Sequence, residues 1–214
     1  SAYDDLQNMV GLTEAKTVIQ KALNYYKLQK LYEEKGMKQD NPAMHMVFTG
    51  NPGTAKTTAA RLFARIMRDN GLLSRGQLVE VGRGDLVGKY VGWTAQTVQA
   101  KFREAKGGVL FIDEAYSLYR GKDDSFGLEA IDTLVKGMED NRDDLIVILA
   151  GYTKEMATFL TANSGLQSRF PNIIEFPDYS GEELTEIAQI NATSRGYRLS
   201  EDAKAALLDY FCVV

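Results

Sequence analysis

The stretch from Gly50 to Thr57 constrains the fold more than any other part of the chain, and it reads Gly-Asn-Pro-Gly-Thr-Ala-Lys-Thr. A short apolar run at 46–48 precedes it, and a long helix-like run at 58–68 follows it. A strand, a glycine-rich loop and a helix in this order predict a phosphate-binding loop. In such a loop successive backbone N–H groups point at a phosphate, and the helix behind adds its positive dipole end.

Two side chains at the end of this loop have expected roles. Lys56 should hold the outer phosphates, and the Thr57 hydroxyl is placed to bind Mg²⁺. A glycine- and threonine-rich turn that merely caps a helix is the weaker alternative. The predicted nucleotide contacts in the loop are Asn51, Pro52, Gly53, Thr54, Ala55, Lys56, Thr57 and Thr58.

Ala55 departs from the pattern, because it stands where the second glycine of the motif belongs. A glycine there lets the backbone approach the phosphate closely, so a methyl group could crowd the ligand. Alanine is, however, the smallest side chain that keeps a helical φ, and this position is the helix entry. We therefore expect a working site with weakened nucleotide affinity.

A second motif, Gly-Val-Leu-Phe-Ile-Asp-Glu-Ala, occupies residues 108–115. Its continuous apolar run predicts a strand that is buried on both faces of a parallel sheet. Asp113 and Glu114 follow at the carboxyl end, where open α/β sheets bind their ligands. Asp113 is expected to hold Mg²⁺ through water, and Glu114 to orient or deprotonate the attacking water. An acidic pair that caps a helix is the alternative.

Apolar periodicity organises the rest of the chain. It predicts an α/β fold, a doubly wound parallel five-stranded sheet with helices on both faces, and one boundary near Pro177. The expected strands are 45–49, 77–81, 109–112, 145–150 and 172–176. The expected helices include one capped by Thr13, one over 94–106 capped by Thr94, 125–140, 156–161, 181–194 capped by Ser180, and 199–211 with Ser200 as its cap.

Three further stretches are candidate functional positions. Gly11-Leu12 could contact an adenine base, because a glycine lets backbone reach a base edge; a plain helix-entry turn is the open alternative. The strand at 145–150 ends in Gly151-Tyr152-Thr153, so one polar side chain can face the water that attacks the γ-phosphate. The glycine-rich loop at 82–93 carries Lys89, Tyr90 and Val91 at its tip, either for function or to cover the core.

Composition narrows the function classes. The formal net charge is −4, from 25 basic and 29 acidic residues without a polybasic run. Neither a broad nucleic-acid surface nor an anionic-membrane surface is therefore expected, and a local nucleic-acid groove is the alternative left open. Cys212 is the single cysteine, which fits a reducing cytoplasm, and the N-terminus lacks a signal-peptide pattern. His45 is the single histidine and reads as a strand-end packing residue, so no histidine cluster can bind a metal.

The motifs in this order resemble those of the AAA+ ATPases and, more narrowly, of the CbbX / stage V sporulation protein K / EccA group. The stretches that carry the resemblance are 45–54, 85–92, 126–131, 149–152 and 163–170. The resemblance implies ATP and Mg²⁺ as cofactors, and a homo-hexameric ring when the protein is full length and ATP-bound. It matches Arg169 to the arginine finger that completes a neighbour's site, and Lys89-Tyr90-Val91 to a central-pore loop that grips an extended polypeptide. Tyr152 or Thr153 falls at the strand-end sensor, although the common asparagine is absent.

The resemblance implies an ATPase that remodels or threads a protein substrate. A nucleotide-dependent switch or assembly scaffold with little hydrolysis is the alternative, and the net acidic charge disfavours a nucleic-acid motor. Residues 1–177 would form the large nucleotide-binding subdomain and 178–214 part of a small helical lid. The family's lid arginine has no counterpart before Val214, so we expect a mostly monomeric chain with weak ATPase activity.

Overall fold

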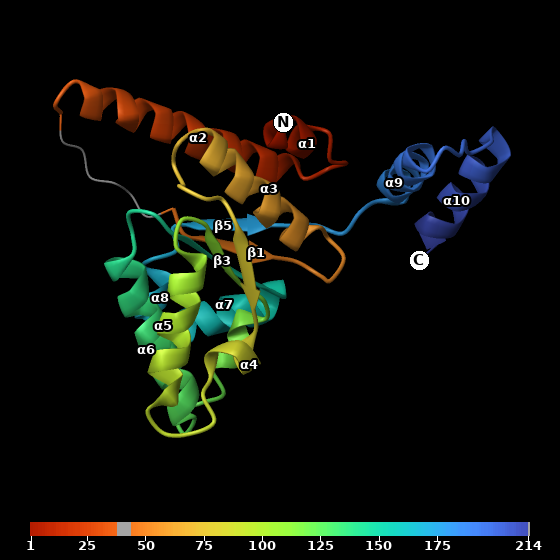
Figure 1. Cartoon of the computed structure of the whole chain (residues 1–214). Coiled ribbons are helices and arrows are strands. Elements are labelled where there is room, and N and C mark those ends of the chain that lie inside the picture. Colours follow the sequence, from red (N-terminus) through yellow and green to blue (C-terminus); the bar gives the residue numbers. More distant parts are fainter. Residues whose placement is uncertain (38–43, 214) are drawn as a thin grey trace.

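The computed structural model describes residues 1–37 and 44–213, and it is built on a five-stranded sheet (Figure 1). The strand order is β2-β3-β4-β1-β5, and the β1–β4, β1–β5, β2–β3 and β3–β4 pairs are all parallel. The predicted doubly wound α/β fold is therefore confirmed. The strands are β1 (Met46–Thr49), β2 (Leu78–Val81), β3 (Val109–Ile112), β4 (Ile146–Gly151) and β5 (Asn172–Glu175).

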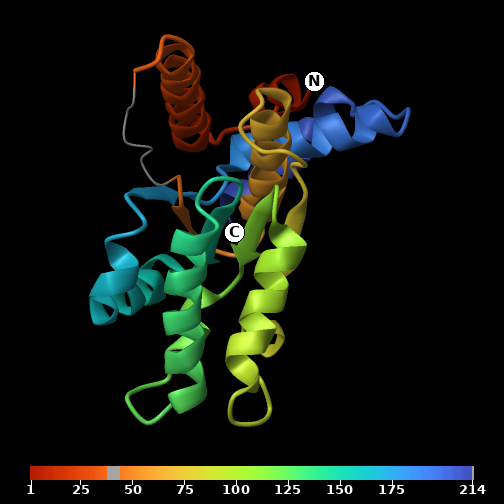
Figure 2. The same ribbon diagram turned by 60° about the vertical axis from the view of Figure 1, so that its left-hand side comes forward.

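Helices connect the strands and cover both faces of the sheet, as Figures 1 and 2 show. The loop predicted over 82–93 contains one short helix, α4, and the helix predicted over 156–161 is longer than expected. The helices are α1 (Ala2–Gln7), α2 (Thr13–Glu34), α3 (Lys56–Asp69), α4 (Arg83–Leu86), α5 (Trp93–Ala105), the 3₁₀ helix η1 (Ala115–Leu118), α6 (Ser125–Asp140), α7 (Thr153–Ala162), α8 (Ser164–Gln167), α9 (Gly181–Ser194) and α10 (Glu201–Val213).

The sheet separates two hydrophobic clusters, because successive strand residues point to opposite faces. Phe48 and Phe111 are fully buried in the cluster that α1, α2 and α3 cover. Val47 and Leu110, their neighbours in the chain, belong to the cluster that α4 to α8 cover. This burial of both faces explains why the strands read as continuous apolar runs.

Two predicted helix caps are wrong and two are confirmed. Thr13 is the first residue of α2, and its N-cap is Leu12 in the left-handed conformation, with no side-chain hydrogen bond. Thr94 lies inside α5 and is buried. Its Oγ1 atom accepts a hydrogen bond from the Gly88 N–H and not from an N–H group in the first turn of the helix. The Ser180 and Ser200 hydroxyls do accept from backbone N–H groups of the first turns of α9 and α10.

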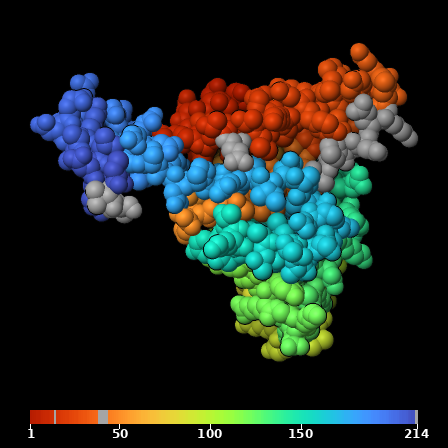
Figure 3. All heavy atoms as spheres, turned by 180° about the vertical axis from the view of Figure 1, so that it is seen from behind, coloured from red at the N-terminus to blue at the C-terminus, as the bar shows by residue number. Residues whose placement is uncertain are grey.

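Helices α9 and α10 pack against each other and follow β5 in the chain (Figure 1). Figure 3 shows the blue C-terminal residues at one side of the molecule, seen from behind. Gly181 at the start of α9 is buried because Cys212 of α10 lies directly against it. The other described residues of this hairpin are exposed or half-buried. The division of the chain at 177/178 stays a prediction. None of the described helices is both long enough and apolar enough to cross a lipid bilayer.

Candidate nucleotide-binding site

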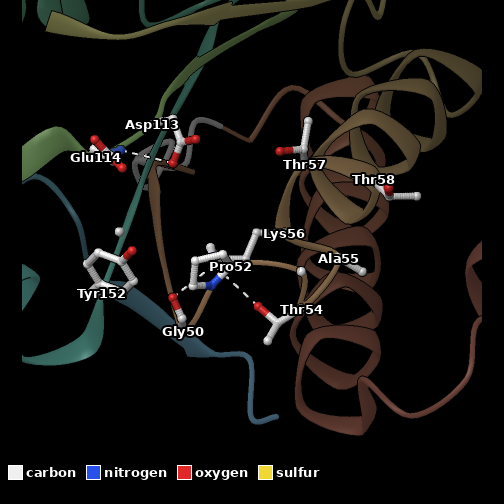
Figure 4. Close-up of a pocket in the computed structure, with 12 residues that line it drawn as sticks. Gly50, Pro52, Thr54, Ala55, Lys56, Thr57, Thr58, Asp113, Glu114 and Tyr152 are labelled. Carbon is white, nitrogen blue, oxygen red and sulfur yellow. Dashed lines mark hydrogen bonds between the residues drawn. The ribbon is translucent and has the colours of Figure 1, made fainter. Parts of the chain in front are cut away.

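A cavity of about 350 Å³ lies at the carboxyl end of the sheet, where β1, β3 and β4 end (Figure 4). One wall is the loop after β1 with the first turn of α3, and the other carries the acidic pair and a tyrosine. Segments far apart in the chain meet here because parallel strands end at one edge. The lining residues are Gly50, Pro52, Gly53, Thr54, Ala55, Lys56, Thr57, Thr58, Asp113, Glu114, Gly151 and Tyr152.

The loop between β1 and α3 is held in shape by contacts at both ends. Gly50 has a φ of 147°, and a Cβ atom there would overlap the carbonyl oxygen of Phe176. Its N–H donates to the Gly151 carbonyl over 3.1 Å, which ties the loop to the end of β4. The buried Thr54 hydroxyl donates to the Asn51 carbonyl over 2.7 Å. These contacts therefore hold the loop in a tight turn immediately before α3.

Ala55 does not keep the helical φ that we expected. Its φ of 67° and ψ of 22° are left-handed, and α3 begins only at Lys56. A left-handed conformation costs an L-residue roughly 1–2 kcal/mol, whereas glycine adopts it freely. The motif position thus demands a positive φ, and the loop keeps this shape despite a Cβ atom.

Lys56 lies over the loop in the structure. Its Nζ atom donates to the carbonyls of Gly50 and Asn51 over 2.9 Å and 2.8 Å. Partial burial lowers the pKa of this ammonium group, and the nearby carboxylates of Asp113 and Asp178 oppose that shift. The lysine is therefore a charge at the mouth of the cavity that can exchange carbonyl partners for phosphate oxygens.

Asp113 and Glu114 follow β3 directly and face the loop across the cavity (Figure 4). The Asp113 Oδ1 atom accepts from the Glu114 N–H over 2.9 Å. Glu114 itself has a φ of 48° and an exposed side chain. A left-handed glutamate is uncommon, and such conformations occur often at functional sites, where surrounding contacts hold them. Here the Glu114 carbonyl accepts from the Ser117 hydroxyl and from the Ser117 N–H.

Tyr152 lines the cavity, whereas Thr153 is the first residue of α7 and does not. The Tyr152 ring stacks on Tyr116 with the centroids 6.1 Å apart, so it has a fixed neighbour. Partial burial, and then the charge of Glu114, raise the pKa of the Tyr116 hydroxyl. Sequence reasoning missed Tyr116, and its position two residues after Glu114 was the one available signal.

Asn51 and Gly11-Leu12 lie outside the lining of this cavity. The Asn51 amide donates to both carboxylate oxygens of Asp178, over 3.0 Å and 3.1 Å, and so links the loop to the chain after β5. Gly11 lies against the side chains of Glu183 and Tyr179, next to the same connection. Leu12 is buried in the core cluster. Their proposed contacts with a nucleotide remain predictions.

The donors around the cavity fit one hydrated Mg²⁺ ion better than a metal held by protein alone. Thr57 and Asp113 supply hard oxygen atoms on opposite walls. Among the described residues there is no cluster of three histidine, cysteine or acidic side chains that could hold a metal. Mg²⁺ commonly takes one or two protein ligands and completes its shell with water and phosphate oxygens. The residues present therefore suit Mg²⁺ bound together with a nucleotide.

Arg169 lies at the opposite end of the sheet. It precedes β5, which runs parallel to β1, and it lines a second cavity of about 290 Å³ with His45 and Ile146 at the starts of two other strands. Its guanidinium pairs with Glu139 of α6 and donates to the Gly165 carbonyl over 2.6 Å. Its Nε atom is buried, and no hydrogen-bond partner for it exists within the described ranges. Arg169 is thus half-buried, and its guanidinium already has partners within this chain.

Lys89, Tyr90 and Val91 line neither of these cavities and lie on the loop between α4 and α5. Their side chains are exposed, so the alternative in which this tip folds back over the core is wrong. Trp93, which sequence reasoning passed over, packs its ring against Tyr90 with the centroids 5.4 Å apart.

The sequence matches the family described as "ATPase family associated with various cellular activities (AAA)" over residues 46–178. It is 48% identical over 210 residues to stage V sporulation protein K of Bacillus subtilis, which covers 98% of this chain and 65% of that protein. It is 44% identical to the chloroplastic ribulose bisphosphate carboxylase/oxygenase activase of Cyanidioschyzon merolae, over 97% of this chain and 71% of that protein. Protein CbbX of Cereibacter sphaeroides is 44% identical, over 95% of this chain and 66% of its own length. The chain thus spans roughly two thirds of these relatives.

Proposed function

The chain belongs to the AAA family of ATPases, and we propose that it hydrolyses Mg²⁺-ATP to pull on a polypeptide held at the loop around Tyr90. One observation carries the enzymatic part. Lys56, Thr57, Asp113 and Glu114 line one cavity, although they come from two separate strand ends. This set contains the phosphate-binding, magnesium-binding and water-activating groups that ATP hydrolysis requires.

The loop and the first turn of α3 would hold the triphosphate. Backbone N–H groups of residues 53–57 and the positive end of α3 suit an anion, and Lys56 would turn from its carbonyl partners to the outer phosphates. Thr57 would bind Mg²⁺ directly and Asp113 through water. When bound, the ion neutralises charge that develops between the β- and γ-phosphates. Asn51, Pro52, Gly53, Thr54, Ala55 and Thr58 complete the proposed contacts.

Glu114 would act on the attacking water. Its carboxylate takes the proton while the water oxygen bonds to the γ-phosphorus, and the bond from that phosphorus to the bridging oxygen breaks, leaving ADP and phosphate. Tyr152 is the better supported sensor of the two candidates, because it lines the cavity and Thr153 does not. Its hydroxyl would hydrogen-bond the water or the γ-phosphate.

Arg169 would complete the site of a neighbouring chain. A strand of the length of β1 spans about 13 Å, so an arginine at its starting end cannot reach a phosphate bound at its finishing end. An arginine finger supplied in trans stabilises the charge on the transferred phosphoryl group. This geometry supports a ring, which we propose to be a homo-hexamer, with residues 178–214 as the start of a lid.

The loop at Lys89, Tyr90 and Val91 would hold the client. Tyr90 and Val91 are exposed apolar side chains on a short loop, and an aromatic ring can pack against side chains of any sequence. One relative is named as an activase of another enzyme, which is consistent with a protein client here as well.

A nucleotide-dependent switch with little hydrolysis is the second candidate. The left-handed Ala55 favours it, because a strained loop with an added methyl group would bind the phosphate less well. The two functions differ in turnover and not in fold.

The experiment that tests the proposal is steady-state ATP hydrolysis measured over a wide range of chain concentrations. An ATPase that needs Arg169 in trans should show a rate per chain that rises with concentration. A rate per chain that is constant and measurable would contradict the trans arrangement. Binding of Mg²⁺-ATP by calorimetry without hydrolysis at any concentration would favour the switch.

A further inference from the structure

We infer that the client segments of this protein are acidic, because the end of the molecule that would hold them combines two aromatic rings with exposed basic side chains. This inference rests on the proposed function and adds the chemical class of the substrate. The surface consists of two loops, residues 87–94 and residues 119–124, which we call the tip. Both loops lie at the same end of the molecule in Figures 1 and 2.

The apolar part of the tip is larger than the three residues that the sequence singled out. Tyr90, Val91 and Trp93 are 64%, 89% and 58% exposed, respectively. The Tyr90 and Trp93 rings meet edge to face, with an angle of 66° between their planes. Edge-to-face pairs are a favourable arrangement of aromatic rings, so Trp93 positions Tyr90 and adds its own surface.

The first loop of the tip is held by hydrogen bonds. The Gly88 N–H donates to the Thr94 hydroxyl over 3.0 Å, and the Trp93 N–H donates to the Tyr90 carbonyl over 3.1 Å. Gly88 has no room for a Cβ atom, because the backbone of Trp93 lies against it. An ordered loop loses less conformational freedom on binding, which favours a specific surface over a passive connector.

The second loop contributes positive charge. Arg120 and Lys122 are exposed on it, and Lys89 is exposed on the first loop. Asp124 is the N-cap of α6 and is paired with Arg83 over 2.8 Å, so its charge is already balanced. The hydrogen bond from Arg83, with smaller contributions that include the charge of Arg120, lowers the pKa of Asp124 and keeps it ionised.

Two other carboxylates lie near this surface. Asp123 is exposed on the second loop, and Asp85 caps the Gly82 N–H at the base of the first. The tip therefore carries three basic side chains and two carboxylates, and one of the carboxylates, Asp124, is already paired with Arg83. This excess of positive charge occurs in a chain whose formal net charge is −4. The N-terminus of α5 adds partial positive charge because no side chain caps it.

This combination fits an extended acidic peptide that also carries apolar side chains. Carboxylates would be attracted to the three cations, and apolar side chains would pack on the two rings. A single-stranded nucleic acid fits less well, because its binding relies on a longer track of cations and on ring faces free for base stacking. In the tip one ring edge already covers part of a ring face.

Trp93 is the only tryptophan in the chain, so its fluorescence reports directly on the tip. The experiment titrates the whole chain, with Mg²⁺-ATP present, with three peptides that share leucine and phenylalanine positions. Their other positions are all glutamate, all glutamine or all lysine, and oligothymidylate is the fourth probe. We expect the glutamate peptide to bind about tenfold more tightly than the lysine peptide, with a preference that salt weakens.

The variants test the assignment to the tip. Combined Lys89→Glu, Arg120→Glu and Lys122→Glu changes should reverse the preference while Trp93 still reports binding. Matched Lys21→Glu, Lys27→Glu and Lys30→Glu changes on α2 reverse the same number of charges elsewhere and should leave the preference in place. Equal binding of the three peptides, an unchanged preference in the tip variant, or tighter binding of oligothymidylate would overturn the inference.

The same samples separate this inference from the proposed function. If peptides of every charge bind at Trp93 and stimulate ATP hydrolysis equally, the acidic preference is wrong and the remodelling function stands. If no peptide changes the fluorescence or the hydrolysis rate, the loop does not hold a client at all, and both fail together.

Discussion

The two ends of the sheet carry different kinds of site. At the carboxyl end, a lysine, a threonine and two acidic side chains surround one cavity, and the loop in front of the lysine is closed by its own hydrogen bonds. At the amino end, Arg169 is paired with Glu139 and lines a second cavity together with apolar and charged side chains. The first end brings together groups suited to a phosphate and a metal ion, and the second holds Arg169, which we propose to act on the site of a neighbouring chain.

This difference indicates which step of the proposed reaction needs each end of the sheet. Binding of ATP would need only the carboxyl end of one chain, because the proposed phosphate-binding groups lie there. Hydrolysis would also need the amino end of a second chain. A nucleotide bound by a single chain would then be held without being turned over quickly, so assembly controls the reaction.

The largest expected effect is at the carboxyl end. Glu114→Gln should lower ATP turnover by about 10²- to 10⁴-fold, because the amide cannot accept the proton of the attacking water. Mg²⁺-ATP binding should persist, which calorimetry can check beside a single-turnover hydrolysis assay. Glu155→Gln, a change at an exposed residue of α7, serves as the matched control. Unchanged turnover in Glu114→Gln would favour the switch and not the ATPase.

At the amino end, Arg169→Ala should lower turnover by about 10³-fold under conditions of assembly, at the lower end of what arginine fingers contribute. It should leave nucleotide binding to the single chain intact. Arg142→Ala is the control, because Arg142 lines the same cavity and carries the same charge. Equal losses in the two variants would mean that the cavity, and not the finger, matters.

His45 at the amino end makes a pH-dependent contribution to folding. Burial lowers the pKa of His45 from 6.5 to about 4, and its Nδ1 atom accepts from the Val147 N–H over 2.9 Å. The unfolded chain therefore takes up a proton between these values and the folded chain does not. Buried neutral His45 contributes fully to the free energy of unfolding above the unfolded pKa of 6.5. As the pH falls toward the folded pKa of about 4, the free energy of unfolding decreases by about 3 kcal/mol in total. Urea unfolding of the protein and of His45→Gln at several pH values should show a flatter acid limb for the variant. Parallel curves would contradict this.

The smallest expected effect concerns the strain at the carboxyl end. Ala55→Gly should raise the free energy of unfolding by about 1 kcal/mol, because glycine adopts the left-handed conformation without the Cβ clash. The melting temperature should rise by about 2–4 °C. Ala100→Gly, on an exposed position inside α5, should instead destabilise the protein by about 1 kcal/mol. A destabilised Ala55→Gly variant would show that the loop is not strained as described.

Local patterns predicted the strands, the phosphate loop and the acidic pair, because each depends on residues close together in the chain. The parallel sheet then brought Lys56 and Asp113 to one edge as expected. The prediction of a helical φ for Ala55 was wrong, because it rests on the small size of alanine. The turn in front of α3 requires a left-handed φ at this position. The cap at Thr94 was also wrong, because Gly88 takes its hydroxyl.

Contacts between distant segments could not be predicted. Glu139 holds Arg169 from 30 residues away, and no periodicity encodes that pairing. The link from Asn51 to Asp178 spans 127 residues and depends on where β5 ends beside β1. The contact of Trp93 with the Tyr90 ring was not predicted, because Trp93 belongs to no recognised motif and the contact depends on the fold of the loop.

The most direct test mixes two variants that are each defective at one end of the sheet. Glu114→Gln keeps Arg169, and Arg169→Ala keeps Glu114, so neither should hydrolyse ATP well alone. A mixture should recover activity, with a maximum at an intermediate ratio, because some interfaces then combine an intact Glu114 with an intact Arg169. If no ratio gives more activity than the sum of the separate variants, the two ends do not form one site, and the account is contradicted.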